Sequence, residues 1–455
     1  MTSTSASPST VRRRHALAAI SSAVVLGLTF GSSGPAGATT ASAAADRNTF
    51  VVAADAAAGA VHVLRASDLR RTGSLAGLDV DVHAGTVVLP DGRVILADEH
   101  GTVHAVRIER AGRPVIERSA AIPTGGRDWA GAAWAAIDPS LRHYGVSSAY
   151  EDSPDQSVTV VDLQTFAVRQ LPVTVDKVGD GYTELQVTFG GRPAQIVTAA
   201  GGKFRTYPLA DVLAGRVPAA TSSAPLGADN HGPAVSRRGD RHFSTTADGI
   251  DGVALPGAKL VGHASVAYSA TRNVVQVWRP RWSSDDRTVW GSMNEDTGLA
   301  PAQWAEQRNH VHVLDTSAAR SSLTKLPDGL PGRLALSTRY AAVTTLSPQG
   351  DVTTLIDADP RSATYRRVVG TVALAPLARG PVADRVPDDA ETRFTAITPD
   401  GARAFVTSGG EGRITAVDTR TRAVSRTVTV PTPLTGGGYL TVVRLGAPVT
   451  DLVAR

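Results

Sequence analysis

Short apolar runs separated by turn residues dominate the chain after about its first fifty residues. Runs of four to seven residues rich in valine, isoleucine and alanine alternate with clusters of glycine, aspartate, proline and serine. Such short runs bounded by turn residues are typical of β-strands, whereas an amphipathic helix needs apolar residues at three- and four-residue spacing over a longer stretch. Helical spacing occurs only in short stretches such as residues 209–215 and 301–308. The pattern predicts an all-β protein.

One module of three strands and two turns recurs along the chain. Its clearest copy is residues 85–108, GTVVLPDGRVILADEHGTVHAVRI, and residues 394–430 repeat it with the corner ITAVD followed by an outer strand. Residues 145–173 and 309–327 repeat its second half. Residues 228–282 also read as one unit, so the count is seven or eight. The eight candidate units lie near residues 49–78, 79–124, 127–175, 181–226, 228–260, 261–328, 332–378 and 390–432.

The first unit lacks a first strand, and the end of the sequence can supply it. Residues 439–446, YLTVVRLG, form a strand-like run with no partner of their own. Repeats of about 40–50 residues that close on themselves in this way are the signature of a β-propeller. The sequence therefore predicts one β-propeller domain over residues 46–455. We expect seven or eight blades, with the C-terminal strand completing the first blade.

The first 45 residues are predicted to be a signal peptide and processing region. Three arginines at positions 12–14 precede an apolar run over residues 18–30, and small residues follow, with a plausible cleavage site at residues 41–43. The apolar run is too short to remain as a membrane span. We therefore expect an exported, extracytoplasmic protein that has no membrane span after processing.

Charge and cysteine content narrow the classes of function. The full chain carries 46 basic and 42 acidic residues, and the predicted signal peptide contains three of the arginines and no acids. The mature protein is therefore close to neutral, which argues against a dedicated nucleic-acid binder, because such proteins need a clustered basic field. The chain has no cysteine, so thiol catalysis and thiolate metal sites are excluded. We expect a monomer.

Three histidines share a position relative to the predicted first strands. His83, His231 and His263 each lie ten residues before the expected start of a second strand, at Arg93, Arg241 and Asn273. Like positions in different blades converge at one end of a propeller channel. The same register places Tyr182 and Arg393 at two further positions.

These histidines, with nearby carboxylates, form a candidate metal site. Asp81 precedes His83 and Asp229 precedes His231, and Glu184 lies alongside. Neutral imidazoles and carboxylates are the ligands that Zn²⁺ accepts where thiolates are absent. The predicted ligands are His231, His263, His83, Asp229 and Asp81, with His231 and His263 as the best pair because their units are neighbours. The alternative is that histidines at strand starts are solvated or bonded to carbonyl groups.

Residues 184–255 resemble the secreted β-propeller zinc metallochaperones that serve ABC-type importers. The likeness lies in QVTFGGRPAQIVTAAGGKFRTYPLADVLAG followed by APLGADNHGPAV. The family motif His-His-Gly-x-Ala-Val reads Asn-His-Gly-Pro-Ala-Val over residues 230–235, so His231 matches and Asn230 departs. The resemblance covers about a sixth of the chain. It implies a propeller fold, export, zinc binding, and a solute-binding protein of an ABC metal importer as partner.

Two other functions remain open on the sequence. A non-enzymatic propeller could bind a peptide or glycan without metal, and four of the six tryptophans fall within residues 278–304, at positions 278, 282, 290 and 304. These aromatic residues form either a recognition surface or internal packing. A propeller lyase with a histidine base at the channel mouth is the third interpretation. We find no nucleophile motif and no phosphate-binding glycine loop, so an enzyme is the less favoured interpretation.

Overall fold

A computed structural model describes most of the chain after the predicted signal peptide. Residues 1–45 of that prediction and the candidate ligand Asp229 lie outside the described residues. The side chain of Trp278 also lies outside them. The described ranges are 48–148, 153–179, 181–228, 230–246, 249–265, 276–294, 301–318, 320–381, 391–449 and 451–454.

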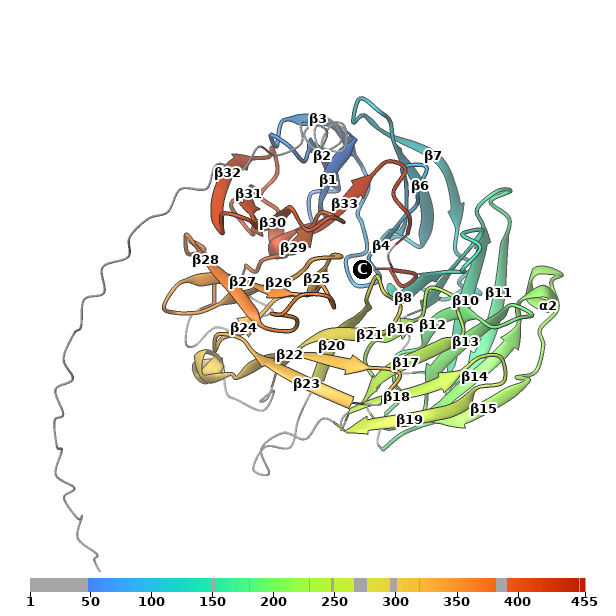
Figure 1. The fold of residues 1–455 in the computed structure, drawn as a ribbon. Coiled ribbons are helices and arrows are strands. Elements are labelled where there is room, and N and C mark those ends of the chain that lie inside the picture. Colours follow the sequence, from blue (N-terminus) through green and yellow to red (C-terminus); the bar gives the residue numbers. More distant parts are fainter. Residues whose placement is uncertain are drawn as a thin grey trace, which may run out of the picture. The chain divides into compact units, whose positions relative to one another are not determined.

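The described residues form eight antiparallel sheets arranged in a ring, and we call the region along the axis of the ring the channel (Figure 1). Each sheet is one blade, and its first strand lies at the centre of the ring while its last strand lies at the rim. The eight-blade form of the prediction is therefore the correct one. Helical structure in the described part is limited to short segments such as α2 (Leu209–Leu213), η1 (Pro301–Glu306) and η3 (Thr435–Gly437).

The first four blades, each given from the centre outwards, follow the predicted units closely. Blade 1 contains β33 (Tyr439–Arg444), β1 (Thr49–Asp55), β2 (Ala60–Arg65) and β3 (Arg71–Ala76). Blade 2 contains β4 (Thr86–Val88), β5 (Arg93–Ala97), β6 (Thr102–Ile108) and β7 (Pro114–Ala121). Blade 3 contains β8 (Ala132–Ile137), β9 (His143–Ser148), β10 (Asp155–Asp162) and β11 (Val168–Thr174). Blade 4 contains β12 (Gln186–Gly190), β13 (Gln195–Ala200), β14 (Lys203–Pro208) and β15 (Ser222–Pro225).

The other four blades complete the ring. Blade 5 contains β16 (Pro233–Val235), β17 (Arg241–Thr246), β18 (Gly249–Ala254) and β19 (Lys259–Ser265). Blade 6 contains β20 (Gln276–Trp282), β21 (Thr288–Asn294), β22 (Asn309–Asp315) and β23 (Arg320–Lys325). Blade 7 contains β24 (Leu330–Pro331) and β25 (Ala335–Leu336), both paired with β26 (Tyr340–Leu346), then β27 (Asp351–Asp357) and β28 (Val368–Leu374). Blade 8 contains β29 (Thr395–Ile397), β30 (Arg403–Ser408), β31 (Arg413–Asp418) and β32 (Ala423–Thr429).

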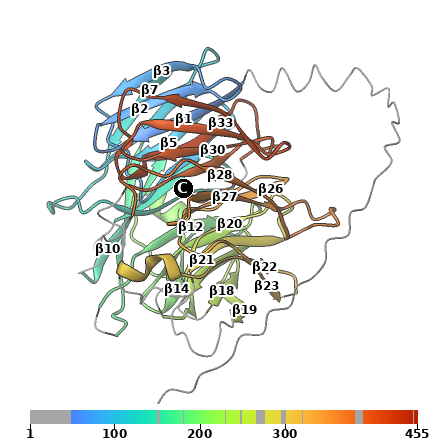
Figure 2. The same ribbon diagram turned by 90° about the vertical axis from the view of Figure 1, so that its left-hand side faces the viewer.

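The ring closes as the sequence predicts. The C-terminal strand β33 pairs antiparallel with β1, so residues from the two ends of the propeller share blade 1. Blade 1 in turn packs against blade 8, and Figure 2 shows β33 and β30 beside each other. One predicted boundary is wrong: β19 is the outer strand of blade 5, whereas the predicted division between residues 260 and 261 falls within this strand.

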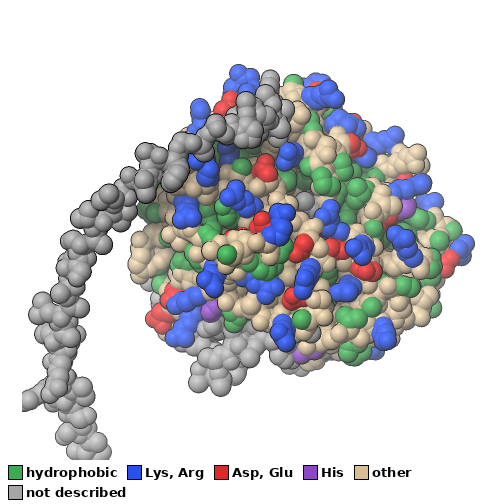
Figure 3. Space-filling model, viewed as in Figure 1, with side chains coloured by type: hydrophobic (Ala, Val, Ile, Leu, Met, Phe, Trp, Pro, Cys, Tyr) green, Lys and Arg blue, Asp and Glu red, His purple; other side chains and the backbone are tan. Residues whose placement is uncertain are grey.

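Burial explains why many strands are continuous apolar runs. Every residue of β1, β8, β9, β12 and β13 is buried, because inner strands are covered on both faces by the neighbouring blades. Rim strands such as β11 alternate between buried and exposed residues. Figure 3 shows Lys and Arg side chains scattered over the visible face with Asp and Glu among them. Among the described residues, no helix is long and apolar enough to cross a membrane.

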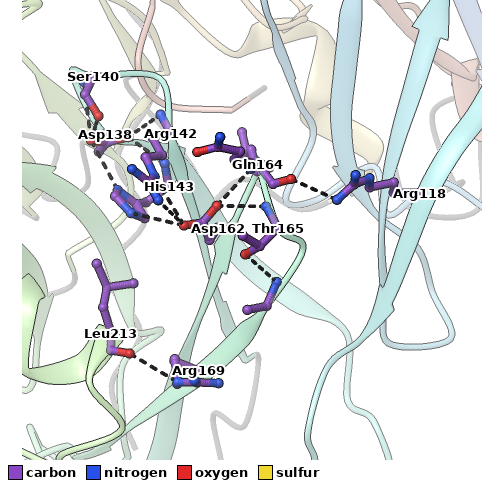
Figure 4. A network of polar contacts seen from close by, with 12 residues as sticks. Arg118, Asp138, Ser140, Arg142, His143, Asp162, Gln164, Thr165, Arg169 and Leu213 are labelled. Atoms are coloured by element: carbon purple, nitrogen blue, oxygen red, sulfur yellow. Dashed lines mark hydrogen bonds and ion pairs between the residues drawn. The ribbon is translucent and has the colours of Figure 1, made fainter.

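An aspartate at the end of the third strand closes the turn to the rim strand in several blades. In blade 3, one carboxylate oxygen of Asp162 accepts hydrogen bonds from the backbone of Gln164 and Thr165, at 2.8 and 3.0 Å. Arg142 contacts the other oxygen at 3.0 Å (Figure 4). Burial opposes ionisation, but these hydrogen bonds lower the pKa of Asp162 to about 2. The repeated V-x-D corner is therefore an Asx turn.

Candidate functional site

The innermost strands begin at one end of the channel, which we call the entry end. The backbone N–H of Thr86, at the start of β4, donates to the hydroxyl of Tyr439, at the start of β33, over 3.0 Å. The N–H of Ala132, at the start of β8, donates to Oδ2 of Asp81, just before β4, over 2.7 Å. Residues that precede different innermost strands therefore meet here, as the cyclic arrangement predicts.

A bulge in β8 directs Trp134 towards this end. Ala132 pairs with Ser148 and Ala135 with Val146, so the register shifts at Ala133 and Trp134. The hydroxyl of Ser147 accepts from the N–H of Trp134 and donates to its C=O, both at 3.1 Å, which replaces the missing ladder bonds. Bulges commonly re-aim a side chain in this way. The buried indole donates from Nε1 to Oε2 of Glu184 over 2.6 Å.

The backbone on either side of Glu184, at the start of blade 4, is held by hydrogen bonds to the side chain of Gln156. The side-chain amide of Gln156 donates to the C=O of Thr183, and its oxygen accepts from the N–H of Leu185 at 3.0 Å. The side chain of Glu184 is 12% exposed, so the carboxylate lies near the surface of the channel mouth. With Oε2 engaged by Trp134, Oε1 faces the other residues of the site.

His83 lies against this carboxylate. Its Nε2 is 3.5 Å from Oε1 of Glu184, and its side chain is 37% exposed. Asp81 fixes its backbone, because Oδ1 accepts from the N–H groups of His83 and Ala84 at 2.9 and 3.0 Å. Asp81 is buried with both oxygens bonded to backbone N–H groups, including that of Ala132. Its carboxylate thus positions His83 and does not face the mouth.

His231 reaches the same group from blade 5. Its ring centroid is 5.8 Å from that of Trp134, the same distance as the centroid of His83. Thr245 holds the backbone of His231 through an N–H···O=C bond of 3.0 Å and a hydroxyl bond of 2.6 Å. Asn230 is buried and its amide donates to the C=O of Ala199 at 3.1 Å. The residue that departs from the family motif is therefore a structural clamp.

We call His83, Glu184, His231 and Trp134 the entry cluster. The spacing of two of its side chains, His83 and Glu184, is that of two ligands of one metal ion. Two ligands on one tetrahedral zinc ion, each about 2.0–2.2 Å from the metal, lie roughly 3.3–3.6 Å apart. The 3.5 Å between Nε2 of His83 and Oε1 of Glu184 matches that separation. Within the described part of the chain, no group of three His, Asp or Glu side chains is close enough to hold a metal as it stands. Among these described residues, His231 can become a third ligand only if its side chain shifts.

The predicted placement of His263 is wrong. His263 lies on β19, the rim strand of blade 5, and its Nδ1 is 2.7 Å from Oδ1 of Asp251 on β18. The sequence around it resembled a strand entering the channel because an apolar run is followed by turn residues. The strand that contains His263, Lys259–Ser265, instead ends the preceding blade. His83 and His231 gather at the hub, and His263 does not.

In the tryptophan-rich region, the side chains that the structure describes pack inside the protein. Trp282, Trp290 and Trp304 are 3%, 0% and 7% exposed, and Trp282 and Trp290 lie on β20 and β21. The burial of these three side chains contradicts the interpretation as a recognition surface and agrees with internal packing. The indole of Trp282 packs against Phe243 of blade 5 at 5.5 Å between ring centroids.

Acidic residues lie beside the entry cluster on blade 2. His100 pairs with Asp79 at 2.7 Å, and His104 pairs with Asp98 at 2.9 Å. Loss of hydration, together with repulsion from Asp81 and Asp79, raises the pKa of Glu99 to about 7. This side of the mouth therefore carries a carboxyl group that is half-protonated near neutral pH, and an added cation would favour its ionised form.

Two residues of the entry cluster were not predicted as ligands or partners. The sequence indicates Glu184 only as a neighbouring carboxylate and does not point to Trp134. The register pointed to Tyr182 because the second strand of blade 4 was expected at Arg192, whereas β13 begins at Gln195. This three-residue shift moves the equivalent position towards Glu184. Trp134 lies in an apolar run, and nothing in that run indicates a bulge.

Solved structures with this fold exist at low sequence identity. The dihydro-heme d1 dehydrogenase NirN, solved in complex with DHE, has a TM-score of 0.56 and 14% identity over 88% of this chain and 76% of that one. Apo AztD from Citrobacter koseri has a TM-score of 0.57 and 13% identity over 87% of this chain and 97% of that one. Identities this low show the fold alone. A scan against protein-family models and a search of curated proteins both find no match.

Proposed function

We propose that this protein is an exported propeller that binds a divalent transition-metal ion, with zinc as the favoured ion, at the entry end. The observation that carries the proposal is the 3.5 Å contact between Nε2 of His83 and Oε1 of Glu184, with His231 on the same indole. A chain without cysteine can hold zinc only through imidazole, carboxylate or backbone groups. Zinc is here a cargo, and its recipient is the solute-binding protein of an ABC metal importer.

The cluster has the properties of a site that exchanges its cargo. Nε2 of His83 and Oε1 of Glu184 supply one nitrogen and one oxygen, and the partly exposed His83 gives access from solvent. The indole of Trp134 holds the carboxylate orientation, which is the role that a second layer of hydrogen bonds has around metal ligands. Two preformed ligands, with a third that has to move into place, favour moderate affinity over permanent retention.

The test is zinc titration by calorimetry of protein purified without an affinity tag. We expect one zinc ion per wild-type chain. His83→Ala, His231→Ala and Glu184→Gln should each weaken binding by about tenfold or more, because each removes a ligand. Glu184→Gln still offers an oxygen to Trp134 but turns an amide NH2 group, which cannot bind a metal, towards His83.

His263→Ala is the matched control. It removes a histidine from the rim strand of blade 5, where its partner is the carboxylate of Asp251. Its zinc affinity should equal that of the wild type. Equal affinity in the His83 and His231 variants, or loss of binding in the His263 variant, rejects the entry cluster as the site.

Zinc binding should also depend on pH. A histidine ligand must be neutral to bind the metal, and the ordinary pKa of histidine is about 6.5. Affinity should therefore fall most steeply as pH decreases below about 6.5. A titration series between pH 5 and 8 measures this, and constant affinity across the series would exclude imidazole ligands.

A further inference from the structure

The chain does not leave the ring after the closing strand β33. The N–H of Gly446 donates to the C=O of Pro90 in blade 2 over 2.8 Å, and the segment then turns towards the channel axis. In Figure 1 this C-terminal segment reaches the centre of the ring. It occupies the exit end, where the innermost strands finish. We call the described residues 447–449 and 451–454 the plug segment.

The plug segment pairs with the inner edge of blade 3. Its Ala454 N–H donates to the C=O of Ala135, and the N–H of Ile137 donates to the C=O of Leu452, both over 2.8 Å. Val453 forms an antiparallel bridge with Ala136. The edge of β8 would otherwise present unpaired backbone groups, and its alanines leave room for a close approach. This is strand addition inside the channel.

A charged contact and apolar contacts fix the register of this segment. Oδ2 of Asp451 lies 3.0 Å from Nη1 of Arg281 on β20, across the channel from β8, and Oδ1 accepts from the N–H of Val453. The Arg281 and Asp451 side chains are 23% and 13% exposed. Leu452 and Val453 are 4% and 2% exposed and pack in one apolar cluster with residues of blades 2, 3 and 5.

The fit between plug and ring leaves a cavity. A space of about 140 Å³ lies between the innermost strands and the plug. Its wall includes Arg281, Thr441 and Thr395 from the ring and Val449, Asp451 and Val453 from the plug. The plug segment thus forms one wall of a recess at the exit end. The blades themselves are complete without it, because all eight sheets are built from other residues.

We propose that the exit end of the channel is a peptide-binding site, occupied here by the chain's own plug segment. The ligand class is an extended peptide with an aspartate followed by small aliphatic residues. Arg281 selects the carboxylate, the edge of β8 binds the backbone, and the apolar cluster accepts the aliphatic side chains. A partner peptide of this chemistry binds when the plug is displaced. This site is independent of metal binding at the entry end.

The test separates the plug from the ring and returns it as a free peptide. A chain that ends at Gly446 is titrated with a fluorescein-labelled peptide of residues 447–455, APVTDLVAR, by fluorescence anisotropy. The shortened chain should bind the peptide. The full chain should bind it at least about tenfold more weakly, because the tethered segment competes at a high effective concentration. Binding of equal strength by both chains, or none by a folded shortened chain, overturns the proposal.

Two variants of the shortened chain test the recognition of the carboxylate. Arg281→Gln should weaken peptide binding by about fivefold or more, and a peptide carrying Asp451→Asn should lose a similar factor. Arg287→Gln is the matched control, because Arg287 lies in the same blade and pairs with Asp315 away from the channel. Equal effects of Arg281→Gln and Arg287→Gln would reject Arg281 as the recognition group.

A measurement on the full chain keeps the proposal falsifiable if the shortened chain does not fold. The chain has no cysteine, so Thr441→Cys places a single thiol on the cavity wall. Labelling by a maleimide should be slow in this variant. It should become several times faster when Asp451→Asn is added, because the plug is then displaced more often. Equal labelling rates with and without Asp451→Asn overturn the proposal.

Discussion

At the entry end, polar side chains from four blades meet in a partly exposed group, whereas at the exit end one segment of the chain fills the space with aliphatic side chains. The entry cluster combines His83, Glu184 and His231 around one indole. The exit end combines the backbone edge of β8, one ion pair and the buried Leu452 and Val453. The first end offers ligand atoms to solvent, whereas the second covers backbone groups and aliphatic side chains.

The difference between the two ends shows where a functional site can form in a fold of repeated blades. Equivalent residues at strand starts converge whatever their identity, so changes at single positions can assemble a site there. At the same register position Arg393 of blade 8 is buried, and its Nε lies 2.7 Å from Oδ2 of Asp351 in blade 7. One blade thus uses this position for stability and another uses it for a candidate ligand. Contrasting variants at the two ends can test this division.

The largest effect should come from breaking the buried pair near the entry end. The Arg393 side chain is 1% exposed, and Asp351→Ala leaves its guanidinium charge without a carboxylate. Removing one partner of a buried pair destabilises a protein by about 3–5 kcal/mol. Urea unfolding followed by circular dichroism should show this loss. Glu109→Ala at an exposed pair should leave the midpoint unchanged, and a loss under about 1 kcal/mol for Asp351→Ala contradicts the role of this pair.

The fold could be predicted because each blade repeats a local pattern. Apolar runs, turn residues and the V-x-D corner each specify a few neighbouring residues, and repetition made the ring the simplest arrangement. The closing strand was predictable for the same reason, because the first unit lacked one strand. The boundary after blade 5 was not, because the rim strand that contains His263 has the same apolar pattern as an innermost strand.

The site was predictable only as far as the register was correct. His83 and His231 precede second strands that begin at Arg93 and Arg241, as expected, and both lie at the hub. Trp134 joins them because of a bulge, which depends on Ser147 in the adjacent strand. The plug segment depends on contacts among four blades. Such long-range pairings leave no periodic trace in one sequence.

A smaller effect is expected at the exit end. Leu452 is 4% exposed within the apolar cluster of the plug segment. Leu452→Ala should lower the free energy of unfolding by about 2–3 kcal/mol, the lower part of the range for buried leucines. Leu323→Ala on the rim strand β23, where the side chain is 40% exposed, is the control and should change stability by less than about 0.5 kcal/mol. Equal losses in thermal unfolding would show that the plug is not packed.

Lowering the pH should destabilise the protein through a buried histidine rather than through the histidines of the rim strands. His242 is fully buried at the start of β17, and burial lowers its pKa to about 3. The unfolded chain takes up a proton below about pH 6.5, but the folded chain does not until about pH 3, so the free energy of unfolding falls as pH decreases through this window. One such histidine contributes a loss of about 2 kcal/mol between pH 6.5 and 5.

The variant His242→Asn isolates that contribution. Asparagine can still meet the hydroxyl of Thr188, which lies 2.6 Å from Nδ1 of His242, but it does not titrate. Urea unfolding at several pH values should show a shallower decline for this variant than for the wild type. His263→Asn, on the rim, should leave the decline unchanged. Parallel declines for all three proteins would mean that His242 is not the acid-sensitive group.

The smallest effect should come from the hydrogen bond that orients the entry cluster. Trp134→Phe keeps an aromatic ring beside His83 and His231 but removes the Nε1–H donor to Glu184, a bond of 2.6 Å. Loss of a hydrogen bond to a charged group destabilises by about 1–2 kcal/mol, and the partly exposed carboxylate can recover some of it from water. Zinc affinity should fall by several-fold because the carboxylate is then free to turn away from His83. Unfolding and zinc titration on the same preparation separate the two effects: a loss of stability with unchanged affinity would mean that Trp134 supports the fold alone, whereas the division between the two ends requires both to change.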